Sequence, residues 1–354
     1  MILNKKLVYF YISYPYYFPH FLPIGYELKK ENYIVKYILS NNQNNLVMEK
    51  IAKDNNLDYE FGEEKLFNKE VDIIFFANNF NKVSELSAKT IFMGHAIGTK
   101  NCAHDKMINK CDIVLVEGDY RYKKFSNEFP EYKYKLYKVG YSKLDLIVNN
   151  IKKETLIKKY NLDSSKKTIV YAPTFFPASI EKMSDSFPND FKEYNIIVKP
   201  HYLSLQRDRY KKQRKKFEKW KKYSNCQIMG VEEYNLIPFL ILADILISDE
   251  SSAIFEFAAL NKPVIINRFL KLRWTYYLNP NKLLKRMDKG IEDYRIIGAN
   301  PNSYNEMVKD VYENINNPEK YEKIRLEKSK DLCGNVDGKV SNRIFNIVRR
   351  LLNE

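Results

Sequence analysis

Short apolar runs alternate with amphipathic stretches along most of this chain of 354 residues. The runs are rich in Val, Ile, Tyr and Phe, which favours strands, and the stretches between them repeat apolar residues at helical spacing. In the first half, strands are expected at Leu7–Ser13, Ile34–Leu39, Val71–Ala77, Thr90–Met93, Asp112–Val116 and Leu136–Val139. Helices are expected at Leu22–Glu31, Leu46–Asn55, Lys82–Ala88, Asp105–Lys110 and Tyr120–Asn127. This alternation predicts a parallel sheet covered by helices on both faces.

A second alternating series follows a polar, lysine-rich run at residues 149–166, where we expect the linker. Its strands are expected at Thr168–Ala172, Tyr194–Val198, Cys226–Met229, Ala243–Ser248 and Lys262–Asn267. The last amphipathic stretch, Gly338–Leu352, is expected to be a helix. The sequence therefore predicts an α/β fold of the GT-B class, with two doubly wound Rossmann-like domains facing a cleft. The expected parts are residues 1–150, residues 166–336 and a C-terminal helix at 337–354.

The charge of the chain is unevenly distributed. The formal net charge is +15, and about half of it lies in Arg207–Lys222, which holds ten basic and two acidic residues. Phe217 and Trp220 stand at i, i+3 spacing, so they fit one side of a helix that leaves the cations on its other faces. This segment is either a solvated surface helix or a helix that contacts anionic lipid headgroups or a polyanionic acceptor.

The cysteines and the apolar segments indicate the cell compartment in which the protein is expected. The four cysteines are widely spaced and form no CxxC or zinc-finger pattern, so we expect neither structural zinc nor a disulfide framework. Leu7–Ser13 is followed by two prolines and is interpreted as a strand rather than a signal peptide. Leu236–Ile247 is too short to span a bilayer. We therefore expect a cytoplasmic protein, with Arg207–Lys222 as the segment that would place it at the inner face of the plasma membrane.

The most informative stretch is the turn Ser248-Asp249-Glu250-Ser251-Ser252, which separates an apolar strand from the helix expected at Ala253–Leu260. Two serines at a helix N-terminus offer hydroxyls and backbone N–H groups, and the helix dipole adds positive potential. This arrangement suits a diphosphate. A purely structural alternative is that one serine caps the helix, which accounts for one serine but not for two with Asp249 in front.

Glu256 follows one turn into that helix. It is not three residues after Ser251 or Ser252, so it does not complete a capping box with either serine. A carboxylate at this place is suited to accept from the ribose hydroxyls of a nucleotide. The alternative is an ordinary surface glutamate.

Two further elements of the second half end in proline. Lys199-Pro200-His201 follows a strand, and Pro200 ends the ladder, so His201 is expected at the carboxyl tip. There it can donate to a diphosphate or protonate a departing phosphate, unless it is a structural histidine. Likewise, Pro173 closes the strand before Thr174, which we expect at the cleft.

The first half has its own candidate in Gly94-His95, after the strand Thr90–Met93. Gly94 permits a sharp turn and close approach of a ligand. A neutral His95 at this edge could take a proton from an attacking hydroxyl. Lys100 follows five residues later. The alternative for His95 is a structural role.

Taken in order, these elements resemble the CDP-glycerol glycerophosphotransferase family, the teichoic-acid primases and polymerases. The matching elements are Gly94-His95 with Lys100, Gly140-Tyr141-Ser142-Lys143-Leu144-Asp145, Tyr171-Ala172-Pro173-Thr174, Lys199-Pro200-His201, Ser248–Ser252 and Asp337-Gly338-Lys339. The chain departs from the family pattern in three places. The family has His-Gly where this chain has Gly94-His95, a tyrosine in place of Glu250, and Pro-Arg in place of Ser142-Lys143, which lacks the bidentate fork.

The resemblance implies attack by an acceptor hydroxyl on the β-phosphorus of a CDP-linked donor, with release of CMP. The first domain would then be the acceptor side and the second the donor side. His95 would be the general base and His201 would act on the leaving group. The donor-binding residues implied are Thr174, Lys199, His201, Asp249, Ser251, Ser252, Glu256 and Lys143. The acceptor would be a polysaccharide or lipid-linked polymer at the cell surface, and no metal or other cofactor is expected.

Two other functions remain open from the sequence. A sugar-nucleotide glycosyltransferase or a non-hydrolysing UDP-sugar 2-epimerase would place an Asp, a small-residue turn and a Glu much as they stand between Asp249 and Val264. A nucleic-acid-binding protein is suggested only by the net charge, because aromatic stacking platforms and nucleic-acid motifs are absent from the sequence. We therefore expect no specific nucleic-acid partner.

Overall fold

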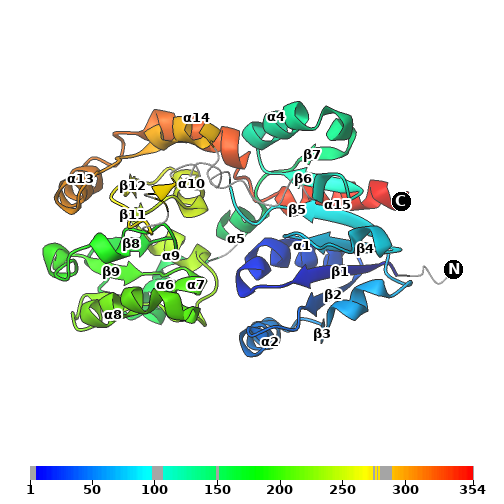
Figure 1. Cartoon of the computed structure of the whole chain (residues 1–354), viewed down its shortest axis with the longest axis horizontal. Helices are drawn as coiled ribbons and strands as arrows, with labels where there is room; N and C mark the ends of the chain where they lie inside the picture. Colours follow the sequence, from blue (N-terminus) through cyan, green and yellow to red (C-terminus); the bar gives the residue numbers. More distant parts are fainter. Residues whose placement is uncertain are drawn as a thin grey trace. The chain divides into compact units, whose positions relative to one another are not determined.

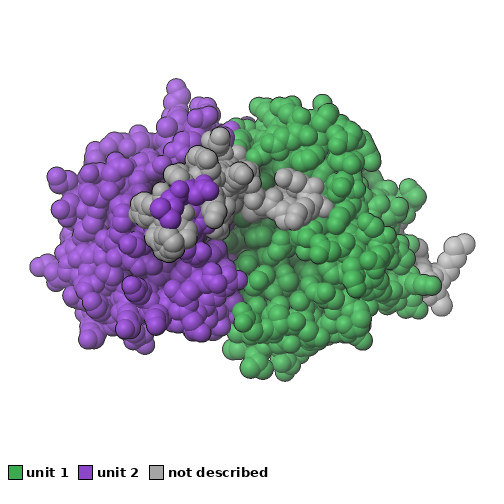
Figure 2. Space-filling view, in the orientation of Figure 1, with its two compact units in different colours: residues 1–97, 102–149, 331–354 green, residues 98–101, 150–330 purple. Residues whose placement is uncertain are grey.

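The computed structural model describes residues 5–97, 107–148, 151–273, 276, 278–279 and 289–353. The contacts within the chain divide it into two compact units, which Figure 2 shows in different colours. Of the described residues, unit 1 holds 5–97, 107–148 and 331–353, and unit 2 holds the others. The C-terminal segment, which we had set apart from both expected domains, thus belongs to the first unit.

Unit 1 is built on a seven-stranded parallel sheet in the order β3-β2-β1-β4-β5-β6-β7. The strands are β1 (Leu7–Ile12), β2 (Ile34–Leu39), β3 (Tyr59–Phe61), β4 (Ile73–Phe76), β5 (Lys89–Met93), β6 (Ile113–Val116) and β7 (Leu136–Lys138). Strands β4 and β6 are buried at every residue, as expected of a parallel sheet covered on both faces. The short edge strand β3 was not predicted, since three residues give little pattern.

The helices of unit 1 are α1 (Phe18–Lys30), α2 (Asn45–Asp54), α4 (Asp119–Glu128), α5 (Asp145–Val148) and α15 (Val340–Leu351). The last of these confirms the predicted C-terminal helix, and it packs against α1 (Figure 1). The buried carboxylate of Asp145 accepts from the backbone N–H of Val340 at 3.2 Å and of Ser341 at 2.8 Å. A carboxylate at this position satisfies N–H groups of the first turn and complements the helix dipole.

One predicted helix of unit 1 is wrong. Lys82–Ala88 forms only a 3-10 turn at Val83–Glu85. Asparagine side chains just before it bond locally, with Asn78 accepting from the N–H of Asn79 at 2.8 Å, and such bonds compete with helix formation. The helix predicted at Asp105–Lys110 begins in residues outside those described.

Unit 2 is built on a five-stranded parallel sheet in the order β10-β9-β8-β11-β12. The strands are β8 (Thr168–Ala172), β9 (Asn195–Val198), β10 (Cys226–Ile228), β11 (Ile245–Ser248) and β12 (Val264–Ile266). All five had been predicted, with bounds that differ by at most two residues. Because every strand is parallel, the carboxyl ends of β8, β9, β11 and β12 lie at one edge of the sheet.

The helices of unit 2 are α6 (Lys153–Lys159), α7 (Tyr202–Gln206), α8 (Lys211–Trp220), α9 (Ile237–Leu242), α10 (Ser252–Ala258) and α13 (Tyr304–Asn316), while α14 (Glu322–Cys333) contains the boundary between the units. Helix α6 lies within the run expected as a linker and packs against α9, with Leu156 buried. The basic segment contains α8, and Phe217 and Trp220, which were predicted to share one side of a helix, are both buried in it.

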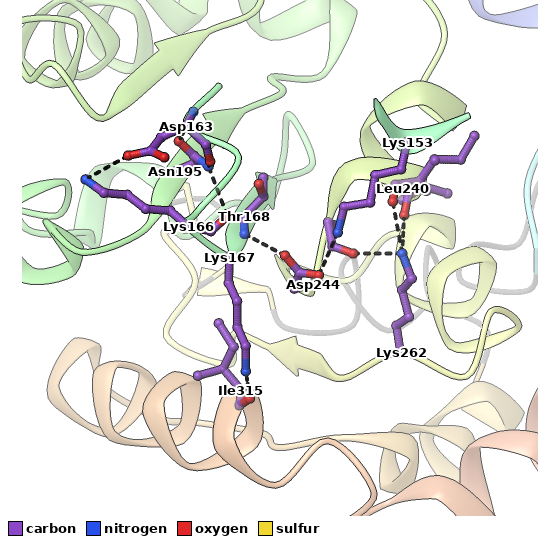
Figure 3. Close-up of polar contacts among 12 residues, drawn as sticks. Lys153, Asp163, Lys166, Lys167, Thr168, Asn195, Leu240, Asp244, Lys262 and Ile315 are labelled. Atoms are coloured by element: carbon purple, nitrogen blue, oxygen red, sulfur yellow. Dashed lines mark hydrogen bonds and ion pairs between the residues drawn. The ribbon is translucent and has the colours of Figure 1, made fainter. Parts of the chain in front are cut away.

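The opposite, amino edge of this sheet is tied together by polar contacts (Figure 3). Asp244 accepts from the backbone N–H of Thr168 at 2.7 Å and pairs with Lys153 at 2.8 Å. Lys262 donates to three carbonyls at the end of α9, including that of Leu240 at 3.2 Å, and burial lowers the pKa of its ammonium to about 8. These contacts satisfy backbone groups, so we assign this edge a structural role.

Within the described residues, the helices are too short or too polar to cross a bilayer. The described cysteines Cys111, Cys226 and Cys333 are buried free thiols, while Cys102 lies outside the described residues.

Candidate active site

The turn between β11 and α10 lies at the carboxyl edge of the unit 2 sheet. Ser251 is the N-cap of α10, and its hydroxyl accepts from the N–H of Ala253 at 3.3 Å. Ser252 donates to the carboxylate of Glu256 at 3.0 Å. Both serines are partly exposed. The two hydroxyls therefore differ in function within the turn: one caps the helix, and the other is oriented by an acid one turn later.

Glu256 lies in a different environment from the one expected. Its side chain is almost fully buried, with the residue 1% exposed, and it accepts from Ser252. A carboxylate buried in this way orients the hydroxyl of Ser252. The predicted direct contact of Glu256 with a ribose would require this side chain to become exposed, and it stays a prediction.

Asp249 is also directed into the protein. Its carboxylate accepts from the backbone N–H of Thr174 at 3.1 Å and from the N–H of Ser179 at 3.2 Å and hydroxyl at 2.5 Å. Burial raises the pKa of this carboxyl to about 7, against the opposing effect of these donors. Asp249 is 0% exposed, and through these bonds it supports the loop after β8; its contact with the donor stays a prediction. The structure thus joins Thr174 and Asp249, two predicted site residues, through a structural contact.

Glu250, the acid that departs from the family pattern, is paired with arginines. Its Oε1 atom lies 3.2 Å from Nη1 of Arg268 and 2.5 Å from Nη2 of Arg295. The added negative charge is therefore compensated within unit 2. Sequence reasoning missed both arginines, because they lie 18 and 45 residues from Glu250 and follow no motif.

His201 lies at the N-cap of α7, after β9. Its Nδ1 atom accepts from the backbone N–H of Leu203 at 3.1 Å, and its ring lies 4.7 Å from that of Phe175. With Nδ1 as acceptor, the proton of the neutral imidazole is on Nε2, which is then a hydrogen-bond donor. This tautomer suits contact with a phosphate oxygen. Lys199, two residues earlier, is half-buried and donates to the carbonyl of Pro200 at 3.2 Å.

His95 belongs to unit 1 and follows β5. Its Nδ1 atom lies 2.7 Å from the carbonyl oxygen of Ala77, which can only accept, so Nδ1 carries the proton. The lone pair of the neutral ring is then on Nε2. The tautomer of His95 is therefore the one required of a general base acting through Nε2.

The loop that carries His95 is held by neighbouring side chains. The buried guanidinium of Arg121 donates to the carbonyl of Ala96 at 2.9 Å and to Glu117 at 2.8 Å. The hydroxyl of Tyr141 donates to the carbonyl of His95 at 3.3 Å. Arg121 was not predicted, since an arginine within a helix carries no signal of its target. Lys100, named with His95 from the sequence, lies outside the described residues.

Lys143 is buried in a 3-10 turn after β7, also in unit 1. Its charge acts on His20, a histidine to which the sequence gave no role. Burial lowers the pKa of His20 well below its usual range, and the charge of Lys143 acts in the same direction. Of the predicted site residues, unit 1 holds His95 and Lys143, and unit 2 holds the others. Within the described residues, His, Cys, Asp and Glu side chains form no group of three or more that could hold a metal ion.

Comparison with known proteins gives consistent results. Residues 88–350 match the model of a family described as CDP-glycerol:poly(glycerophosphate) glycerophosphotransferase. The teichoic acid glycerol-phosphate primase of Bacillus subtilis (strain 168) is 28% identical over 193 residues, which cover 53% of this chain and 44% of that protein. The teichoic acid poly(glycerol phosphate) polymerase of Bacillus spizizenii is 27% identical over 212 residues, covering 53% and 51%. The chain thus spans about half the length of the curated relatives it matches.

Solved structures confirm the fold class. The wall teichoic acid polymerase TagF superposes with a TM-score of 0.71 at 18% identity, covering 99% of this chain and 89% of that one. A putative UDP-N-acetylglucosamine 2-epimerase from Listeria monocytogenes superposes with a TM-score of 0.64 at 10% identity, covering 99% and 98%. At such identities these similarities establish the GT-B fold alone.

Proposed function

Because the chain belongs to the CDP-glycerol:poly(glycerophosphate) glycerophosphotransferase family, we propose that it transfers glycerol phosphate from CDP-glycerol to an acceptor hydroxyl. The acceptor is a teichoic-acid-like or related polymer of the cell envelope. The observation that carries this proposal is the pair of histidine tautomers: a base lone pair on Nε2 of His95 and a donor N–H on Nε2 of His201.

In the proposed step, the acceptor oxygen forms a bond to the β-phosphorus while the bond from that phosphorus to the bridging oxygen breaks. The proton of the acceptor hydroxyl passes to Nε2 of His95. The bridging oxygen leaves with CMP, and His201 together with the serine turn stabilises the charge that develops on it. Asp249 and Glu256 act indirectly, by fixing the loop of Thr174 and the hydroxyl of Ser252. The step as proposed uses no metal ion.

The donor is tested by incubating the purified chain with CDP-glycerol, other CDP-activated alcohols and UDP-sugars, together with a glycerol phosphate oligomer as acceptor. We expect release of CMP from CDP-glycerol that depends on the acceptor, measured by chromatography of the nucleotides. Turnover of UDP-sugars with no CMP release would instead support the glycosyltransferase or epimerase alternative and refute the proposed donor.

We also propose that α8 holds the enzyme at an anionic membrane surface. Its apolar residues Phe217 and Trp220 are buried in unit 2, so contact with lipid would be electrostatic. Lys211, Lys212 and Lys215 are exposed. Each lysine near an anionic surface contributes about 1 kcal/mol. Replacing all three by glutamine is therefore expected to weaken binding to phosphatidylglycerol vesicles by about 100-fold in a sedimentation assay at low salt.

A matched variant removes the same charge elsewhere. Lys29, Lys123 and Lys133 are exposed in unit 1, and their replacement by glutamine should change vesicle binding by less than threefold. Equal losses in both variants would show that net charge alone drives binding. Tight, salt-sensitive binding to RNA without nucleotide turnover would favour the nucleic-acid alternative.

A further inference from the structure

Arg268 and Arg295 lie between two carboxylates of very different exposure. Behind them is Glu250, whose side chain is 11% exposed and whose Oε1 atom contacts both guanidinium groups. In front is Glu292, whose side chain is 59% exposed. One oxygen of Glu292 lies 3.2 Å from Nη2 of Arg268, and the other pairs with Nη1 of Arg295. Both guanidinium groups therefore contact the same exposed carboxylate, and we call the pair Arg268 and Arg295 the fork.

The backbone of both arginines is hydrogen-bonded to neighbouring segments, and Glu250 holds both guanidinium groups. The side chain of Arg295 is 8% exposed, and its backbone carbonyl accepts from Asn300 at 3.0 Å. The backbone N–H of Arg268 donates to the carbonyl of Pro301 at 2.9 Å. Nη1 of Arg295 is buried, and Glu292 is its ion-pair partner. A guanidinium fixed in this way is ready to bind an oxyanion.

The position of the fork relates it to the serine turn. Arg268 follows β12, which pairs with β11, and Glu250 stands between Asp249 and Ser251 in the turn after β11. Without Glu292, the two arginines and Glu250 carry a net charge of +1. A carboxylate that gives one oxygen to each arginine occupies the same contacts that two oxygens of a phosphate would make.

We propose that Arg268 and Arg295 form a phosphate-binding fork of the donor site, and that a phosphate of the nucleoside diphosphate displaces Glu292 from it. Glu250 anchors the fork, which explains why an acid is accommodated in this turn. The identity of the ligand rests on the proposed function, whereas the fork itself rests on the contacts around it. Glu292 competes with the ligand, so its removal should strengthen binding and removal of Arg268 should weaken it.

The test measures CDP binding by titration calorimetry at fixed ionic strength. Glu292→Gln is expected to bind CDP about three- to tenfold more tightly, because an exposed competing ion pair is lost. Arg268→Gln should bind about tenfold more weakly or worse, since charged hydrogen bonds to the phosphate are lost. The control is Asp293→Asn, which removes the same charge from the adjacent exposed residue and should change affinity by less than twofold.

Thermal unfolding of each variant separates binding from folding. Should Arg268→Gln unfold, Arg268→Lys keeps the charge without the fork and should lose part of the affinity. Unchanged or weaker CDP binding in Glu292→Gln would overturn the proposal. If the wild-type chain does not bind CDP, the same variants are titrated with UDP and with inorganic pyrophosphate. With these ligands, tighter binding by Glu292→Gln together with weaker binding by Arg268→Gln would support the fork and refute the CDP donor. If the two variants do not show these changes, the fork is refuted.

Discussion

Replacing His95 by alanine is expected to reduce glycerol phosphate transfer by about 10²–10⁴-fold, the contribution typical of a general base. The contact of Nδ1 with the carbonyl of Ala77 leaves the lone pair of His95 on Nε2, and alanine removes that lone pair. Binding of CDP should stay within about twofold of wild type, because His201 and the serine turn, which are proposed to contact the leaving group, belong to unit 2 and not to the unit of His95. Steady-state transfer and calorimetry measure the two effects separately.

The matched variant for this prediction is His201→Ala. It removes the Nε2 donor at the start of α7 and should weaken CDP binding as well as transfer. The pH profile of kcat/KM is a further readout, because kcat/KM falls at low pH as the general base becomes protonated. This fall should vanish in His95→Ala and persist in His201→Ala. Loss of CDP binding in His95→Ala would mean that the wrong histidine has been assigned as the base.

Asp249→Ala is expected to lower the free energy of unfolding of unit 2 by about 3–5 kcal/mol at neutral pH. The substitution leaves the N–H groups of Thr174 and Ser179 and the hydroxyl of Ser179 without their buried acceptor, at about 1–3 kcal/mol for each such group. Part of that loss is offset, because Tyr171 and Asn267 still contact the hydroxyl of Ser179. Urea unfolding followed by fluorescence measures the change.

The pH dependence of stability gives a second test of Asp249. Burial raises the pKa of its carboxyl in the folded state from 3.8 to about 7, so the folded chain binds more protons than the unfolded chain between these values. The contribution of this group to stability therefore falls as pH rises from about 4 to 7. Between pH 5 and pH 8 wild type should lose more stability than the alanine variant.

An exposed aspartate provides the comparison. Asp185 pairs with Lys216 and Lys219 at the surface, and these ammonium groups lower the pKa of its carboxyl to about 2. Asp185→Ala should leave the unfolding midpoint nearly unchanged, since exposed ion pairs contribute little. If Asp249→Ala behaved like Asp185→Ala, the proposed support of the loop after β8 would be wrong.

The strands and the order of the site elements could be predicted from the sequence for a physical reason. Central strands of a parallel sheet are buried on both faces, so they appear in the sequence as apolar runs, as in Thr168–Ala172. The structure reproduces the predicted bounds of this strand and of Ile34–Leu39, although Lys36 interrupts the second run. The residue that follows such a run stands at the carboxyl edge of the sheet. His95, His201 and the turn of Ser251 were therefore located correctly along the chain, although their proposed roles remain predictions.

The sequence by itself thus determined the fold class, the family and the positions of the candidate residues at strand ends. The tertiary structure decided which way their side chains point. Asp249 and Glu256 stand beside the serines in sequence, yet both are buried and bond to the protein. The negative charge of Glu250, in turn, is compensated by ion pairs with Arg268 and Arg295. Local patterns specify where a strand ends, but burial and ion pairing depend on contacts between segments distant in sequence, which no local pattern encodes.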